Sequence, residues 1–148
     1  MRRARAGTAW VHAVAVPALA ALGCGGGADG PTTYSVTGVV TLHGKPVGEA
    51  LVQFTPIAQE TGAAGAQVQT DGEGRFDVTM AVDMGRREKH GLPAGEYRVA
   101  VTKMEQRGAA SLDNPPRNVL PAKYASAQSS PLKATVKAGD ENVVELKL

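Results

Sequence analysis

The sequence has a single cysteine, few aromatic residues and no acidic residue before Asp29. The lone cysteine excludes an internal disulfide framework and a zinc site built from several cysteines. Aromatic residues make up 4% of the 148 residues, so the hydrophobic core must rest mainly on Val, Leu and Ala. Hydrophobic residues at 43% and charged residues at 20% are typical of a globular chain and argue against wholesale disorder. With 18 glycines and 9 prolines, the fold is expected to be rich in loops.

The positive charge of the chain is concentrated at its N-terminus. Arg2, Arg3 and Arg5 lie within the first five residues, and the formal net charge is +2. Without these three arginines the chain carries 13 basic and 14 acidic residues, so the remainder is close to neutral. A nucleic-acid-binding domain needs an excess of basic residues on its folded part. The sequence therefore predicts no nucleic-acid partner.

The first 23 residues are typical of a secretory signal peptide. A basic stretch at 1–10 precedes twelve mostly apolar residues, 11–22, which are too few to span a bilayer as a helix. The twin arginine near the start lacks the hydrophobic residues that a twin-arginine signal places after it, which favours the general secretory route. The end of the apolar stretch and the two residues after it, Ala-Leu-Gly-Cys at 21–24, resemble the lipobox of bacterial lipoproteins.

The lipobox resemblance implies a modification of Cys24. In that family the chain is cut before the cysteine, here between Gly23 and Cys24, and the cysteine thiol carries a diacylglycerol group. The resemblance thus implies that the membrane is a partner, through an N-terminal lipid anchor. An ordinary secretory cut with Cys24 as a bystander is the alternative. A buried thiol is disfavoured, because three glycines follow directly and cannot build a core.

Residues 24–33 are expected to form a flexible tether between the anchor and the folded domain. Gly25, Gly27 and Gly30 match the GxGxxG pattern of dinucleotide-binding proteins, but that pattern must follow a strand and open a helix. Here it follows the signal and runs into Pro31, so we reject that interpretation. One domain is expected at 34–148, and about 115 residues suffice for one core between two sheets.

From Tyr34 onward, apolar and polar residues alternate with a period of two, which predicts β-strands. Seven strands are expected, at 34–42, 51–55, 66–70, 76–80, 96–103, 132–137 and 142–148. The Gly-rich segment 71–75 is expected to join the third and fourth strands in a tight hairpin. A charged loop at 83–91 and a long connection at 104–130 separate the later strands. The pattern predicts an all-β fold, an antiparallel β-sandwich of about seven strands.

The alternation also predicts which side chains face the core. The inward rows are expected to contain Val52 and Phe54, then Phe76, Val78 and Met80, then Tyr97, Val99 and Val101, and finally Val144, Leu146 and Leu148.

Four segments in order resemble the carboxypeptidase regulatory-like family, whose fold is a transthyretin-like (prealbumin) β-sandwich. They lie at 36–47, 50–54, 70–76 and 92–99, and include the sequences VTGVV, GKPV, TDGEGRF and LPAGEYRV. The stretch 120–132 resembles small secreted lipoproteins of planctomycete-type bacteria. The resemblance implies a transthyretin-like, immunoglobulin-like sandwich outside the cytoplasm. Because members of this family are mostly non-catalytic modules, it also implies that the protein is not an enzyme.

Two polar patterns invite a metal interpretation. Asp71 and Glu73 lie in a Gly-rich turn, but the twelfth position of an EF-hand counted from Asp71 is Val82, so that loop is absent. The alternative is a turn in which Asp71 accepts hydrogen bonds from backbone N–H groups. Beyond the signal there are two histidines, His43 and His90, too few for a catalytic zinc site by themselves. We predict no metal and no cofactor.

Catalytic and ligand-binding motifs are sparse. No Gly-x-Ser-x-Gly motif occurs, and the chain lacks the C-terminal Tyr-Arg-Gly-Ser motif of transthyretin-like hydrolases. Tyr34 and Tyr124 are the aromatic residues left for a sugar-binding platform, although Tyr124 is also suited to hold its loop on the sheet. Arg86 and Arg87 lie in a basic run, either a solvated hairpin tip or a contact for an acidic partner, a cell-surface polymer or anionic headgroups.

The sequence therefore predicts a lipid-anchored module of the bacterial cell envelope with a structural or protein-interaction role. Its expected partners are the membrane and an envelope protein or polysaccharide. A carbohydrate-binding module is the alternative, and a hydrolase on the same scaffold is a remote one.

Overall fold

The computed structural model describes residues 30–58, 65–109, 111–139 and 141–148. Side-chain burial alternates along its strands, which confirms the period-two pattern of the sequence. In the strand Leu51–Pro56, for example, Val52 and Phe54 are buried while Leu51 and Gln53 are exposed. The described residues contain no α-helix, only the short 3-10 segments η1 (Asp83–Gly85) and η2 (Ala122–Tyr124). The predicted all-β class is confirmed.

The chain forms short strands throughout its described length. In order they are β1 (Val36–Leu42), β2 (Lys45–Pro46), β3 (Leu51–Pro56), β4 (Ala66–Gln69), β5 (Arg75–Asp77), β6 (Thr79–Val82), β7 (Arg87–His90), β8 (Gly95–Thr102), β9 (Met104–Glu105), β10 (Arg117–Asn118), β11 (Lys133–Val136) and β12 (Asn142–Lys147).

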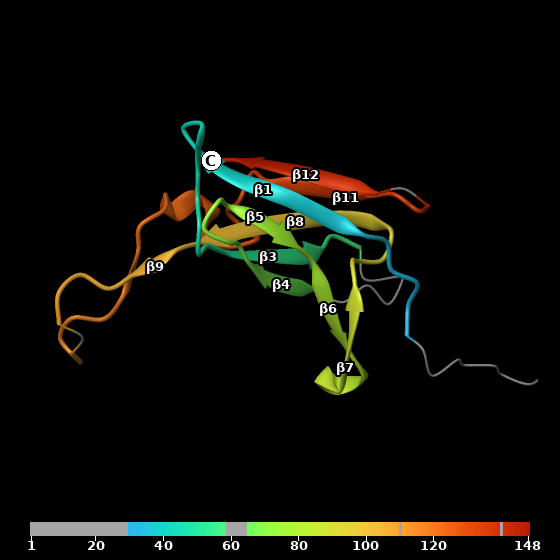
Figure 1. The fold of residues 1–148 in the computed structure, drawn as a ribbon, viewed down its shortest axis with the longest axis horizontal. Coiled ribbons are helices and arrows are strands. Elements are labelled where there is room, and N and C mark those ends of the chain that lie inside the picture. The colour runs from blue at the N-terminus through green and yellow to red at the C-terminus, as the bar shows by residue number, and fades with distance from the viewer. Residues whose placement is uncertain (1–29, 59–64, 110, 140) are drawn as a thin grey trace, which may run out of the picture.

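Two four-stranded sheets form a sandwich-like body (Figure 1). The β1 sheet contains β12, β1, β2 and β5, and the β8 sheet has the order β11-β8-β3-β4. Every pairing in the two sheets is antiparallel except that of β1 with β12, which is parallel from Val36↔Asn142 to Thr41↔Lys147. The parallel pair arises because β11 belongs to the β8 sheet. The chain crosses between the sheets after β11, and β12 then runs beside β1 in the same direction.

The core lies between the two sheets and contains the inward rows that the sequence predicts. Phe54, Tyr97 and Val99 of the β8 sheet are fully buried, and Phe76 and Leu146 of the β1 sheet are buried opposite them. The Phe54 ring lies 5.9 Å from that of Phe76 and 6.4 Å from that of Tyr97, measured between ring centroids. Tilted and edge-on aromatic contacts of this kind add to the stabilisation that burial alone provides. The three rings therefore link the two sheets.

The prediction that the third and fourth expected strands pair with each other in a hairpin is wrong. The turn itself is present, since the N–H of Asp71 donates to the carbonyl of Arg75 at 2.8 Å. However, β4 pairs with β3 in one sheet, and β5 pairs with β1 in the other. The turn chemistry determines the local bend, whereas the partners of the flanking strands are set by distant residues. The turn therefore connects the two sheets.

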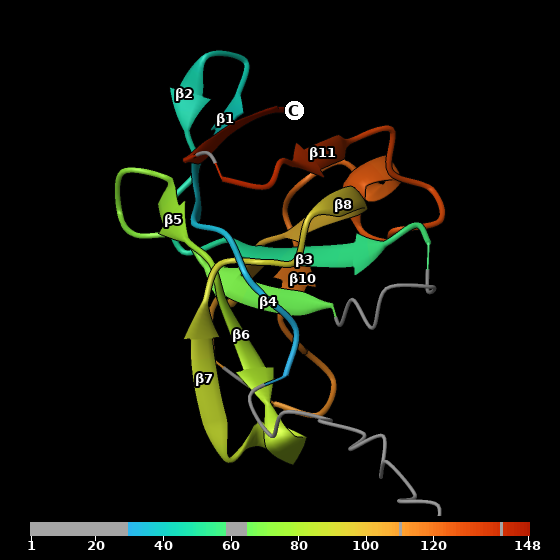
Figure 2. The same ribbon diagram turned by 90° about the vertical axis from the view of Figure 1, so that its right-hand side faces the viewer.

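Two additional ribbons extend from the sandwich, and each contains at least one strand in a segment predicted to lack strands. The predicted loop at 83–91 contains β7, which pairs with β6 from Thr79↔His90 to Val82↔Arg87, and η1 closes this β6–β7 hairpin. The connection at 104–130 contains the β9–β10 ribbon and η2. Figure 2 shows the β6–β7 hairpin projecting from the sandwich. Side chains on β7 are polar on both faces, so no hydrophobic alternation marks it in the sequence.

Candidate functional site

The predicted lipidation site lies outside the described residues. Gly23, Cys24 and the signal 1–23 fall in the segment 1–29, so the cleavage and the anchor stay predictions. Within the described ranges, no helix is both long and apolar enough to cross a bilayer.

The described chain begins beside the β6–β7 hairpin. Gly30 lies against the end of β6, because a Cβ atom built on it would be 3.7 Å from Cγ1 of Val82. The next residue is also held, since the Nζ of Lys89 donates a hydrogen bond to the carbonyl of Pro31 at 3.1 Å. Figure 2 shows this blue segment descending beside β6 towards the far end of the hairpin. The end of the predicted tether is therefore held close to the hairpin tip.

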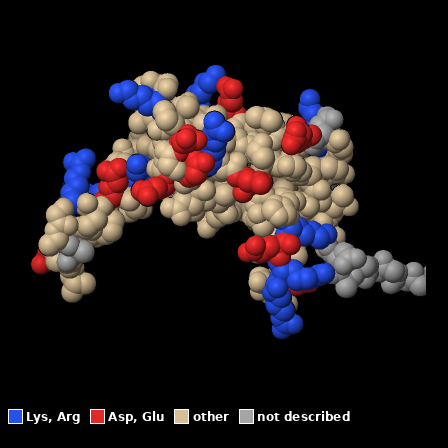
Figure 3. Space-filling model, in the orientation of Figure 1, with Lys and Arg blue, Asp and Glu red and all other residues tan. Residues whose placement is uncertain are grey.

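The structure places Arg86 and Arg87 together at this hairpin tip. Both are exposed, and the Nε of Arg87 forms an ion pair with the Oδ2 of Asp83 across the turn. Glu88, the other acidic residue of the hairpin, lines a groove against β3 and β4 instead. Figure 3 shows basic side chains gathered on this projection below the body. Arg86 and Arg87 are thus presented away from the sandwich, as either interpretation of the basic run requires.

The backbone of the tip is left-handed at three successive residues. Asp83, Met84 and Gly85 have φ angles of 54°, 57° and 84°. For residues other than glycine this conformation costs about 1–2 kcal/mol each, so it is uncommon for methionine. Met84 is nevertheless fully exposed. Sequence reasoning missed Met84, although an apolar residue between Asp83 and Gly85 in a charged stretch was a usable signal.

The two tyrosines proposed as a sugar platform do not have equal exposure. Tyr34 is half-buried, packs against the core and bridges to Leu92. Tyr124 is only 5% exposed and lies in η2, which contacts β8. The ammonium of Lys123 lies 4.7 Å from the centroid of the Tyr124 ring. A stacking platform needs an open ring face, so the burial of Tyr124 favours the alternative in which it holds the long connection on the sheet.

The geometry of the Asp71 turn matches the alternative to a metal site, in which Asp71 accepts hydrogen bonds from backbone N–H groups. The Oδ1 of Asp71 accepts hydrogen bonds from the N–H groups of Glu73 at 2.9 Å and Arg75 at 2.8 Å. The carboxylate of Glu73 lies 3.6 Å from the Nε of Arg75, and both side chains are exposed. Gly74 is buried with φ of 76°, and a Cβ atom there would lie 2.7 Å from the carbonyl oxygen of Val40. The turn therefore caps its own backbone N–H groups and packs on β1.

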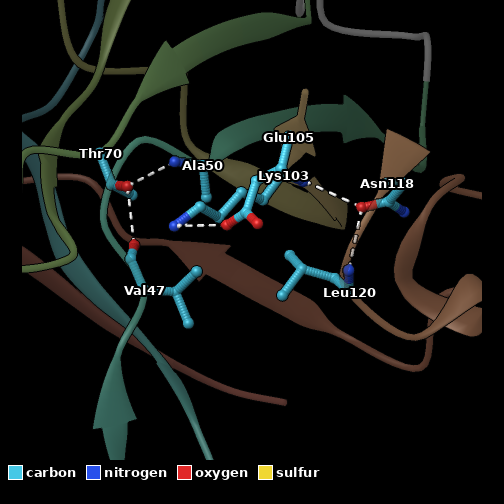
Figure 4. A network of polar contacts seen from close by, with 7 residues as sticks. All are labelled: Val47, Ala50, Thr70, Lys103, Glu105, Asn118 and Leu120. Carbon is cyan, nitrogen blue, oxygen red and sulfur yellow. Dashed lines mark hydrogen bonds and ion pairs between the residues drawn. The ribbon is translucent and has the colours of Figure 1, made fainter. Parts of the chain in front are cut away.

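Polar networks that the sequence did not reveal support the ends of the strands (Figure 4). The Oγ1 of buried Thr70 accepts a hydrogen bond from the N–H of Ala50 at 2.9 Å and donates one to the carbonyl of Val47 at 2.8 Å. The Oδ1 of Asn118 accepts from the N–H of Lys103 at 3.0 Å. These contacts fix loops to strands, and their partners are far apart in sequence, which hides them from local patterns.

Among the surface grooves of the described residues, two border both the sandwich and a ribbon. One of about 560 Å³ lies between β3, β4 and the β6–β7 hairpin, with Gln53, Thr79 and Glu88 among its walls. The other, of about 360 Å³, lies between the β1–β2 turn and the β9–β10 ribbon and is mainly apolar, with Leu42 and Leu120 in its lining. The first groove has Glu88 as its ionisable side chain, and the second contains His43, Lys45 and the Lys103–Glu105 ion pair at its walls.

The ionisable side chains of the described domain are dispersed. His43 is exposed in the turn before β2, and His90 is exposed at the end of β7. Burial raises the pKa of the Tyr97 hydroxyl, which donates a hydrogen bond to the carbonyl of Pro93 at 2.8 Å. This hydroxyl holds the turn before β8. Across the residues that the structure describes, no three His, Cys, Asp or Glu side chains come close enough to hold a metal ion.

Comparison with known family models, curated proteins and solved structures gave no match to this chain.

Proposed function

We propose that this protein is a non-catalytic module of the bacterial cell envelope, held on a membrane by a lipid on Cys24, with a structural or protein-interaction role. The observation that carries the proposal is the order of features along the chain. A basic, then apolar, then small-residue segment ends at Cys24, and ten residues later the folded sandwich begins at Tyr34. A secretory signal that ends at a lipidated cysteine has this order of features, and the residues after Cys24 would then join the anchor to the domain.

We also propose that the sandwich is related to carboxypeptidase regulatory-like domains. The fold supports this relation, because each resembling segment forms a strand or a turn of the body. They form β1 with the turn to β2, then β3, then the Asp71 turn, and then the start of β8. Each lies at a turn or a strand that positions the core.

Partitioning into detergent tests the anchor. Wild-type protein from a lipoprotein-processing bacterium is expected in the detergent phase, with a mature mass that begins at Cys24 and includes acyl chains. Cys24→Ala is expected in the aqueous phase, because each buried CH₂ contributes about 0.8 kcal/mol to membrane binding and the variant lacks them all.

Gly26→Ala is the matched control, since it changes the tether and leaves the thiol. It should partition as wild type does. Wild-type protein in the aqueous phase with a free thiol would contradict the proposed anchor, while a cut at another position would leave the protein secreted.

A further inference from the structure

The tip of the β6–β7 hairpin exposes an apolar side chain to solvent, where it contributes no buried surface to folding. Met84 is fully exposed at the tip, and its backbone is held at φ of 57° between two other left-handed residues. Strained backbone persists where the surroundings over-determine it, and such residues cluster at functional positions. Arg86 follows two residues later and Arg87 three residues later, both exposed. An exposed apolar side chain beside basic ones is the arrangement that contacts a membrane interface.

The acidic residues of the hairpin do not cancel this basic tip. Residues 83–90 contain three basic and two acidic side chains. Asp83 is paired with Arg87 at the tip, and Glu88 lines the groove against β3 and β4. Lys89 is turned towards the tether through its hydrogen bond to Pro31. The side chains presented outward at the tip are therefore Met84 and Arg86, with the Arg87–Asp83 pair beside them.

The length of the tether places this tip near the proposed anchor. Gly30 lies against Val82, which is two residues before Met84. Six residue steps separate Gly30 from Cys24, and a fully extended chain of that length spans at most about 20 Å. A lipid on Cys24 would therefore keep Gly30 within about 20 Å of the bilayer surface, and the hairpin end lies beside Gly30.

We infer that the tip of the β6–β7 hairpin, through Met84 and Arg86 with the Arg87–Asp83 pair beside them, docks on anionic headgroups of the membrane that carries the lipid anchor. This inference rests on the proposed lipid anchor. The tether supplies a high effective concentration, so a weak contact suffices to orient the domain. The β9–β10 ribbon extends from a different part of the body than the hairpin does (Figure 1). The anchor attaches the domain, and the hairpin sets which face points outward.

A single fluorescent label tests the contact in the full, lipidated chain. Cys24 is the one cysteine of the sequence, and its thiol is blocked by the lipid, so Met84→Cys provides a unique labelling site. The probe is an environment-sensitive thiol dye, with the protein on vesicles of phosphatidylcholine or of phosphatidylcholine mixed with phosphatidylglycerol. The matched control is Met104→Cys, an exposed methionine of the β9–β10 ribbon.

The Met84→Cys label is expected to become several-fold brighter on vesicles that contain phosphatidylglycerol. Adding Arg86→Glu should lower the docked-to-undocked ratio about fivefold or more, because each basic residue near an anionic surface favours binding by roughly that factor. Arg117→Glu, at an exposed arginine of the other ribbon, should leave the signal unchanged. The Met104→Cys label should not respond to either vesicle.

Flotation of the unlabelled protein separates the two proposals. Protein that floats with vesicles while the Met84→Cys label stays in water overturns the docking and leaves the anchor intact. Equal responses of the Met84→Cys and Met104→Cys labels also overturn it. A larger response to polyglutamate than to the anionic vesicles overturns it in favour of an acidic protein partner. Protein that fails to float overturns the anchor, and the docking with it.

Discussion

The sandwich and the β6–β7 hairpin place their apolar side chains in opposite ways. In the sandwich, Phe54 and Tyr97 are fully buried, and the turn before β5 places glycine where its backbone is left-handed, at Gly74. At the hairpin tip Met84 is exposed, and it adopts a left-handed conformation that glycine would adopt without strain. His43 and Glu49 in the body also have positive φ angles, but both are polar, so the tip differs in combining a left-handed backbone with an exposed apolar side chain. Such departures are expected at functional sites.

The largest expected effect is in the core. Phe54→Ala should destabilise the domain by roughly 3–5 kcal/mol, because it removes a buried ring that contacts Phe76 and Tyr97 and leaves a cavity. A domain of this size has a free energy of unfolding of about 5–15 kcal/mol, so the variant is expected to be marginal. Chemical denaturation measures the loss. Gln53→Ala, on the exposed face of the same strand, should be nearly neutral, and equal losses would contradict the assigned strand faces.

The next effect is in the Asp71 turn. Gly74→Val should cost roughly 2–4 kcal/mol, because a β-branched residue is strained at a φ of 76° and its Cβ would crowd the carbonyl of Val40. Thermal melting measures the loss. Gly72→Val is the matched control, since a Cβ there meets nothing within 4 Å. A neutral Gly74→Val would show that the turn does not pack on β1.

The sequence predicted the buried strand faces well, for a physical reason. A face that packs on a core must be apolar at every second residue, so Val52 with Phe54, and Tyr97 with Val99, are visible as a pattern. The same reasoning failed for β7, because both faces of that strand meet solvent and its residues carry no alternation. It also failed for the partners of β4 and β5, which depend on residues far along the chain.

The candidate site was predictable in part. Arg86 and Arg87 were found from their charge, and their exposure at a hairpin tip agrees with the prediction. The exposure and backbone strain of Met84 were hidden, because they depend on the turn that β6 and β7 form together. Tyr124 was open to two interpretations, and packing of η2 against β8 favours the structural one.

A smaller loss of stability is expected from removing the hydrogen bonds of the buried Thr70 side chain. Thr70→Val keeps the shape of the side chain but removes its hydrogen bonds to Ala50 and Val47, which should cost about 1–3 kcal/mol because the N–H of Ala50 loses its acceptor. Urea denaturation measures the change. Thr135→Val, at an exposed position on β11, is the control and should change little. An unchanged midpoint for Thr70→Val would mean that water replaces the hydroxyl.

The smallest expected effect has the opposite sign and lies at the hairpin tip. Met84→Gly should stabilise the domain by roughly 0.5–1 kcal/mol, because glycine occupies a φ of 57° without the steric cost that a Cβ atom imposes. Met84 is fully exposed, so the change removes no core contact. The rise in melting temperature is the measurement, and Met104→Gly, in the strand β9, should instead lower it by a similar amount. A protein that gains stability when Met84 is replaced retains that residue at a cost in stability, as expected where function needs a strained, exposed side chain. A loss of stability in Met84→Gly would show that Met84 contributes to folding, and the contrast between the tip and the body would disappear.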